Sequence, residues 1–133
     1  MKCIRVTVPQ NLEKQAEQAL KESDNVFVLF FGRETIEGQS WCPDCVVADP
    51  KVRAGIAKVE NAILLEVPVD RKSDTASDTQ VFRQDESIRL ERIPTLLRYT
   101  AADRFSGARL VEEECHNQDH IDAFVAGLSS RRK

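Results

Sequence analysis

The chain has 133 residues, of which 41% are hydrophobic and 31% charged, a length and a balance that fit one globular domain over residues 1–133. Its formal net charge of −3 lacks the basic excess of proteins that bind nucleic acid through phosphate contacts. The longest apolar run, residues 26–31, is far shorter than the roughly 20 residues that a membrane helix needs. We therefore expect no nucleic-acid partner, no membrane segment and no secretory signal, and a cytoplasmic protein.

Hydrophobic periodicity predicts alternating strands and helices. In chain order these are a strand at 3–8, a helix at 10–22, a strand at 26–31, a helix at 43–58, a strand at 62–69, a helix at 79–90, strands at 95–100 and 108–113, and a helix at 117–128.

The order β-α-β-α-β-α-β-β-α defines an α/β fold. Successive βαβ units predict a parallel core, while two consecutive strands joined by a short turn predict an antiparallel addition. The run at 26–31 is apolar throughout, so we expect it to be buried on both faces. The sequence thus predicts a mixed central sheet with helices on both faces.

One motif, Trp41-Cys42-Pro43-Asp44-Cys45, follows the predicted central strand and opens a helix. Cys42 would cap that helix, where free backbone N–H groups and the helix dipole favour a thiolate. Cys45 would lie one turn further along the same face, close enough to form a disulfide with Cys42. Pro43 would stiffen the first turn without removing a needed donor. The spacing therefore predicts a redox-active dithiol.

The motif, together with Pro50 and the run Ile93-Pro94-Thr95 before a strand, resembles the thioredoxin superfamily. A long loop over residues 32–40 and the runs at 93–99 and 110–115 narrow the likeness further. With these features, the whole chain is similar to the thioredoxin domain-containing protein 17 family, the cytosolic 14-kDa thioredoxin-related proteins.

This resemblance implies a thioredoxin fold and a cytosolic disulfide reductase. Cys42 would be the nucleophile and Cys45 the resolving thiol. The substrates would be small disulfides such as cystine and selected protein disulfides. No cofactor would be bound, because electrons would come from NADPH through thioredoxin reductase or an equivalent reductant. We expect a monomer.

The resemblance also implies a substrate platform beside the dithiol. The Ile93–Pro94 peptide bond would be cis and would expose the Ile93 backbone next to Cys42, where an extended substrate could pair with it. Thr95 would belong to the same platform, and Trp41 would form the wall of the cleft.

The sequence departs from ordinary thioredoxins at Leu29, where those proteins carry a buried aspartate beneath the resolving cysteine. The carboxylate nearest to the cysteines in sequence is Asp44. Three interpretations of Asp44 stay open: an anion that stabilises the first helical turn, a proton relay to Cys45, and a charge that selects substrates.

Two other interpretations of the cysteines need testing. The chain could be a redox-gated protein-binding module with little turnover. Cys115, His116 and His120 also suggest zinc, but a structural zinc site needs four ligands, so we expect no metal. We expect Cys3 and Cys115 to be ordinary structural thiols.

Overall fold

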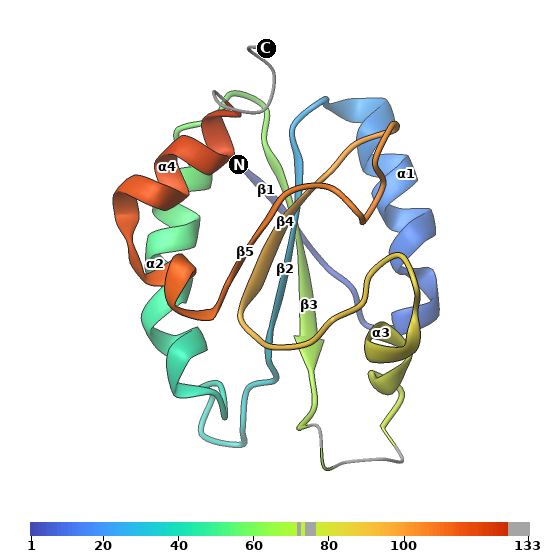
Figure 1. Cartoon of the computed structure of the whole chain (residues 1–133), viewed down its shortest axis with the longest axis vertical. Coiled ribbons are helices and arrows are strands. Elements are labelled where there is room, and N and C mark those ends of the chain that lie inside the picture. Colours follow the sequence, from blue (N-terminus) through green and yellow to red (C-terminus); the bar gives the residue numbers. More distant parts are fainter. Residues whose placement is uncertain (72, 74–76, 128–133) are drawn as a thin grey trace.

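The computed structural model describes residues 1–71, 73 and 77–127, in which a five-stranded sheet lies between two pairs of helices (Figure 1). The elements are β1 (Lys2–Arg5), a 3-10 helix η1 (Pro9–Asn11), α1 (Leu12–Glu22), β2 (Val26–Gly32), α2 (Pro43–Ile56), β3 (Ile63–Val69), α3 (Gln80–Gln84), β4 (Thr95–Tyr99), β5 (Arg109–Val111), a 3-10 helix η2 (Glu112–His116) and α4 (Gln118–Ala126).

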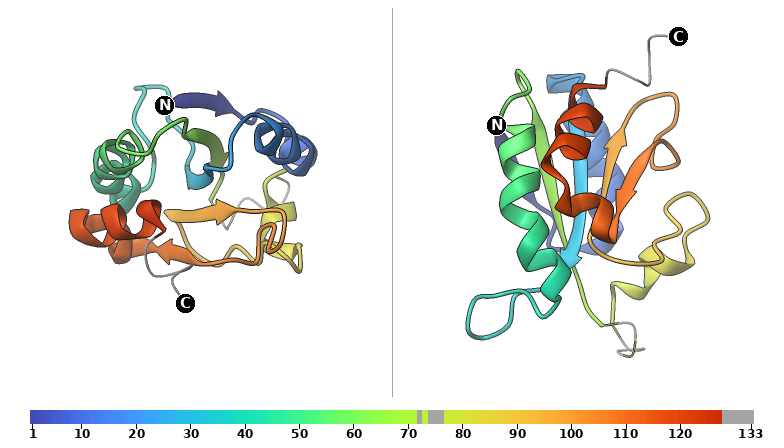
Figure 2. Two further views of the ribbon diagram at one scale, coloured as in Figure 1. Left: turned by 90° about the horizontal axis from the view of Figure 1, so that it is seen from above. Right: turned by 60° about the vertical axis from the view of Figure 1, so that its left-hand side comes forward.

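The sheet has the strand order β1-β3-β2-β4-β5. β3 is parallel to both β1 and β2, whereas β4 is antiparallel to β2 and to β5. The predicted parallel core with an antiparallel addition is therefore confirmed. Helices α2 and α4 cover one face of the sheet and α1 and α3 the other (Figures 1 and 2).

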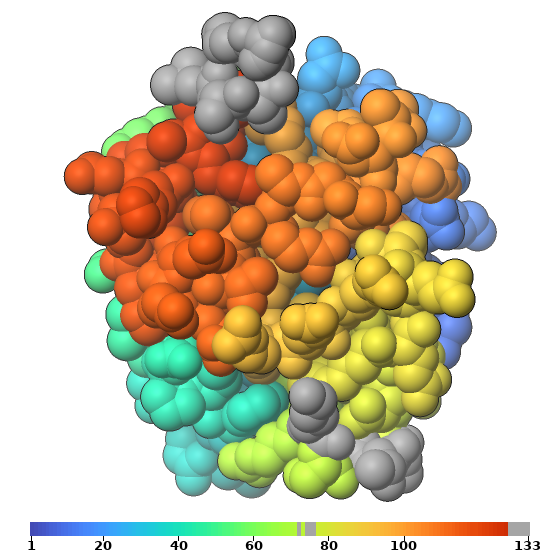
Figure 3. All heavy atoms as spheres, viewed as in Figure 1, coloured from blue at the N-terminus to red at the C-terminus, as the bar shows by residue number. Residues whose placement is uncertain are grey.

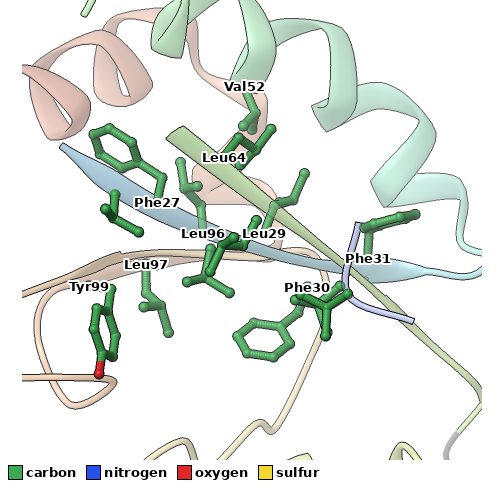
Figure 4. Packing of buried hydrophobic residues seen from close by; sticks show 14 of the residues in the cluster. Phe27, Leu29, Phe30, Phe31, Val52, Leu64, Leu96, Leu97 and Tyr99 are labelled. Carbon is green, nitrogen blue, oxygen red and sulfur yellow. The ribbon is translucent and has the colours of Figure 1, made fainter. Parts of the chain in front are cut away.

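β2 is the central strand, and all of its residues are buried, as the apolar run predicts. On one face, Val52 of α2 points onto Leu64 of β3, while Leu97 and Tyr99 of β4 lie on the other (Figure 4). Each large apolar side chain buried in this way contributes about 1.5–3 kcal/mol. The core thus holds the carboxyl end of β2, and the motif that follows it, on a rigid support.

The predicted helix at 79–90 is wrong in length, since α3 ends at Gln84. The carboxylate of Asp85 accepts hydrogen bonds from the backbone N–H groups of Ser87 (2.8 Å) and Ile88 (3.1 Å). These bonds form a turn that competes with helical hydrogen bonding, so the chain leaves the helix at Asp85.

Other predicted boundaries also move by one to three residues, for example that of the helix at 43–58, which ends at Ile56. The strand predicted at 108–113 ends at Val111, because Glu112 has a φ of 53° and begins η2. The first strand ends at Arg5 rather than residue 8, since the chain turns into η1 at Pro9. The last helix stops at Ala126, before Gly127 with its φ of 66°; Leu128, assigned to that helix, lies outside the described residues.

Candidate active site

A close contact between the end of β2 and the cysteine motif shapes the site. A Cβ atom on Gly32 would lie 2.7 Å from Ser40 Oγ, 2.8 Å from Cys42 Cβ and 3.0 Å from Trp41 Cε2. Only glycine allows the chain that returns from the loop over residues 33–40 to pass so near the strand. The backbone N–H of Gly32 also donates a hydrogen bond to Cys45 Sγ, at 3.3 Å.

Cys42 occupies the N-cap of α2, as the motif predicts. Its sulfur accepts a hydrogen bond from the backbone N–H of Cys45, at 3.3 Å, and lies 3.9 Å from the carbonyl oxygen of Ile93. Ser40 Oγ accepts a hydrogen bond from the backbone N–H of Cys42, at 3.1 Å. Pro43 is the first residue of α2, where no N–H donor is needed.

The two cysteines are free thiols that lie close together, so the structure represents the reduced state. Cys42 is 6% exposed and Cys45 3%, so exposure hardly distinguishes them. The two cysteines differ instead in their hydrogen bonds and in the electrostatic surroundings of their thiols. Burial raises the pKa of the Cys45 thiol far above its ordinary value, and the hydrogen bond with Cys42 raises it further. Cys45 is therefore held as a neutral thiol in the reduced protein.

Leu29 leaves the surroundings of Cys45 without a carboxylate from β2. Its side chain is buried and stands in register with Glu66 of β3 and Leu96 of β4. Glu66 pairs with the guanidinium groups of Arg53 (2.7 Å) and Arg5 (3.3 Å). The carboxylate in register with Leu29 is thus that of Glu66, on the neighbouring strand, and two guanidinium groups already neutralise its charge.

A cavity of about 230 Å³ lies beside Cys45, between α2 and the loop over residues 33–40. Ser40, Asp49 and Arg53 contribute polar groups to its wall. The loop is attached to β1 through Glu34, whose carboxylate pairs with the guanidinium of Arg5 at 2.9 Å. This hydrogen-bonded pair lowers the pKa of Glu34. The Cys45 thiol therefore borders a polar space rather than a sealed core.

Trp41 forms a fixed wall next to the dithiol. Its indole Nε1–H donates a hydrogen bond to the carbonyl oxygen of Val69, at 3.0 Å, at the end of β3. The guanidinium of Arg71 lies 5.2 Å from the centre of the indole ring, within the range of a cation–π contact. Trp41 is partly exposed, so the Trp41–Arg71 pair presents a cationic, aromatic surface to solvent.

The Ile93–Pro94 peptide bond is cis, as the resemblance implies, and the Ile93 carbonyl faces Cys42. The side chain of Thr95, by contrast, is buried, and its hydroxyl donates to the carbonyl oxygen of Arg92 at 2.6 Å. The side chain of Thr95 thus supports this turn from within.

Asp44 lies in the first turn of α2 between the two cysteines, and its side chain is 52% exposed. His116, the last residue of η2, places its Nε2 atom 3.8 Å from Asp44 Oδ1. Sequence reasoning missed this neighbour, along with the contacts of Gly32 and Ser40 around the motif. His116 lies 72 positions from Asp44, so no local sequence pattern indicates their contact. Gly32 could have been identified, because a glycine at the end of an apolar strand indicates a close approach of another backbone segment.

The other two cysteines lie apart from the dithiol's hydrogen bonds. Cys115 is fully buried, which raises the pKa of its thiol to about 12. Cys3 is exposed on the edge strand β1, with its sulfur 3.7 Å from Arg53 Nη1. Within residues 1–71, 73 and 77–127, no cluster of three or more metal-ligating side chains occurs.

The chain matches known proteins over most of its length. A family model described as "Thioredoxin domain-containing protein 17-like, thioredoxin domain" matches residues 6–127. Thioredoxin domain-containing protein 17 of Mus musculus is 34% identical over 105 residues, which cover 77% of this chain and 80% of the mouse protein.

Solved structures show the same fold. Thioredoxin f2 of Chlamydomonas reinhardtii superimposes with a TM-score of 0.61 at 16% identity, covering 98% of this chain and 99% of that one. A thioredoxin f2 complex with ferredoxin:thioredoxin reductase contains a chain that matches with a TM-score of 0.59 at 12% identity, covering 98% of this chain and 96% of that one. Among the described helices, none has the length and apolarity to cross a membrane.

Proposed function

Since this chain belongs to the thioredoxin domain-containing protein 17-like family, we propose that it is a cytoplasmic disulfide reductase that works through Cys42 and Cys45. The fold and the dithiol support a thiol–disulfide oxidoreductase in general. The observation that carries the proposal is the geometry of the motif: one sulfur caps a helix and accepts the N–H of the other cysteine, which lies one turn further on.

The reaction divides between the two sulfurs. The Cys42 thiolate attacks one sulfur of a substrate disulfide, so that a Cys42–substrate bond forms and the other substrate sulfur leaves as a thiolate. Cys45 then loses its proton and attacks Cys42 Sγ. This step forms the Cys42–Cys45 disulfide and releases the second substrate thiolate. Two electrons thus pass from the dithiol to the substrate.

Cys42 suits the first role because its sulfur faces the Ile93 carbonyl, where a bound disulfide would lie along the cis-proline turn. Cys45 suits the second because it is buried and neutral until a mixed disulfide places an electrophilic sulfur beside it. A neutral thiol is a poor nucleophile, so Cys45 does not compete for substrate and each turnover begins at Cys42.

The proposed substrates are small disulfides such as cystine and selected protein disulfides. The Ile93 carbonyl lies beside the Cys42 sulfur and Trp41 directly precedes Cys42 in the chain, so both would contact them. The proposed electron source is NADPH, through thioredoxin reductase or an equivalent reductant. The thioredoxin fold of a neighbour solved with a reductase supports a partner of this kind.

A coupled turnover assay tests the proposal. The reduced protein is supplied in catalytic amounts with NADPH, thioredoxin reductase and either cystine or insulin, and NADPH oxidation is followed. We expect many turnovers per molecule, which Cys42→Ser abolishes, while Cys3→Ser leaves them unchanged. Parallel assays with glutathione plus glutaredoxin, or with trypanothione, would identify an equivalent reductant. At most one turnover with every reductant would favour a redox-gated binding module instead.

A further inference from the structure

The imidazole of His116 is an unpartnered group at the edge of the dithiol. Its Nε2 atom is covered by surrounding protein and makes no hydrogen bond to any atom of the described residues. The same atom lies 3.8 Å from Asp44 Oδ1, beyond hydrogen-bond length but within the reach of an ion pair. A buried polar atom that points toward a carboxylate without another partner requires an explanation.

The backbone holds His116 in this place. The carbonyl oxygen of His116 accepts a hydrogen bond of 2.7 Å from Lys51 Nζ, which ties the end of η2 to α2. At the start of α4, the side-chain oxygen of Asn117 accepts the N–H of His120 at 3.0 Å and fixes the chain that follows. The atoms of η2 lie directly against those of the first half of α2 (Figure 3). The imidazole is thus placed by the packing of two elements.

We propose that His116 is a positioning residue that compensates the negative charge of Asp44 beside the dithiol. Uncompensated, the Asp44 carboxylate opposes a thiolate on Cys42, since two like charges would share the first turn of α2. A protonated imidazole pairs with the carboxylate and removes that opposition. The inference deepens the proposed reductase function, because it concerns how readily Cys42 becomes the attacking thiolate.

The compensation depends on pH, because imidazole is the side chain that ordinarily gains its charge between pH 8 and pH 5. Charged groups also come from the elements packed against η2. α2 supplies Asp44 and Lys51, whose ammonium bonds the His116 carbonyl oxygen, and α4 supplies Asp119, His120 and Asp122, which pairs with Lys58. β4 carries Arg98, and β5 carries Arg109, whose guanidinium donates to the carbonyl oxygens of Ile88 and Phe105. η2 itself supplies Glu112, which pairs with Arg92, together with Glu113 and Glu114. Of these contacts, the 3.8 Å pair with Asp44 is the one that joins the imidazole to the cysteine motif.

The test measures the rate at which iodoacetamide alkylates Cys42, by mass spectrometry of the peptide, in a Cys3→Ser background that removes the exposed thiol. At pH 6, His116→Gln should slow alkylation about two- to fivefold, the range that a partly exposed ion pair supports. At pH 8.5 the two rates should agree, since an imidazole ordinarily carries no charge at that pH. In an Asp44→Asn background, His116→Gln should change nothing at either pH.

His120→Gln is the matched control, because it removes the other of the two histidines while leaving the Asp44 neighbour in place. It should leave the rate at pH 6 unchanged. An effect of His116→Gln that persists in the Asp44→Asn background would overturn the proposal, and so would equal rates at pH 6.

If His116→Gln does not fold, Asp44→Asn tests the same interaction by removing the carboxylate instead of the imidazole. On the rising part of the alkylation–pH profile, below its plateau, its gain in rate should increase with pH, because protonated imidazole compensates the carboxylate less as pH rises. A gain that is the same along that part of the profile would refute the pairing. Alkylation needs no substrate or reductase. A failure of the proposed reductase activity therefore leaves this measurement decisive.

Discussion

Replacing Gly32 by alanine tests whether the contact between β2 and the motif positions the dithiol. The new methyl group would lie 2.7 Å from Ser40 Oγ and 2.8 Å from Cys42 Cβ. Carbon atoms in contact prefer about 3.5–4.0 Å, so the motif must retreat by roughly 1 Å. Overpacking of this kind costs about 1–3 kcal/mol. The retreat also lengthens the hydrogen bond from the Gly32 N–H to Cys45 Sγ, which is 3.3 Å in the parent.

The assay pairs a urea titration with the rate of insulin reduction. Gly32→Ala should lower the urea midpoint by about 1 M, the value that this cost and an ordinary m-value imply. It should also slow insulin reduction by at least tenfold, because a misplacement near 1 Å disrupts the attack geometry. Gly107→Ala is the control, since its methyl group would meet the exposed Asp103 side chain at 3.3 Å. Unchanged stability and activity in Gly32→Ala would refute the idea that this contact sets the geometry.

Three further predictions concern single side chains. Cys45→Ser should accumulate substrate as a mixed disulfide on Cys42, visible by mass spectrometry, because no resolving thiol remains; trapping on Cys45 by Cys42→Ser would reverse the roles. Tyr99→Phe should leave the free energy of unfolding unchanged or raise it by up to about 1 kcal/mol, since the buried hydroxyl has no hydrogen-bond partner in the part of the chain that is described; a clear loss in a urea titration would contradict this. The hydrogen bond from Arg33 lowers the pKa of Asp70 in the folded protein. The ionised carboxylate therefore stabilises the folded state above its ordinary pKa near 4, and this stabilisation is lost as pH falls through the lower pKa of the folded state. Asp70→Asn should reduce the difference in urea midpoint between pH 7 and pH 3, and an unchanged difference would exclude the contribution.

Local sequence signals were sufficient for the sheet. The continuous apolar run ending at Phe31 predicted a strand buried on both faces, and it is the central strand β2. Pro68 is a feature that local signals do not explain, because a proline usually lies at a strand end or a sheet edge, whereas this one lies inside β3, which continues to Val69. The neighbouring strand β1 ends at Arg5, in register with Glu66, so no backbone group of β1 needs the N–H that Pro68 lacks. Whether β3 tolerates Pro68 therefore depends on the length of β1, which the sequence around Pro68 does not indicate.

The site divides in the same way. Cys42 at the helix N-cap and Pro43 as its first residue follow from the motif alone, because capping is a local property. The pairing of Asp44 with His116 depends on η2 packing against α2, and no periodicity in the sequence encodes it. Thr95 stays a prediction as a member of the substrate platform, but side chains alternate along a strand and this one points inward, so such a role would fall to its backbone.

Leu29 stands where the resemblance to thioredoxins implies a buried aspartate, and the loop that follows β2 bears on its consequence. With leucine in the central strand, the strand beneath Cys45 offers no group that can exchange a proton with its thiol. Burial raises the pKa of Cys45, whereas the hydrogen bond from the Gly32 N–H lowers it, and so does the hydroxyl of Ser40, which the loop over residues 33–40 brings against the motif. The same loop borders the cavity that reaches Cys45, and the pair between Arg5 and Glu34 attaches it to the sheet. In this chain the polar groups around Cys45 are therefore the N–H of Gly32, at the end of β2, and the hydroxyl of Ser40 in the loop that follows, and β2 supplies no carboxylate.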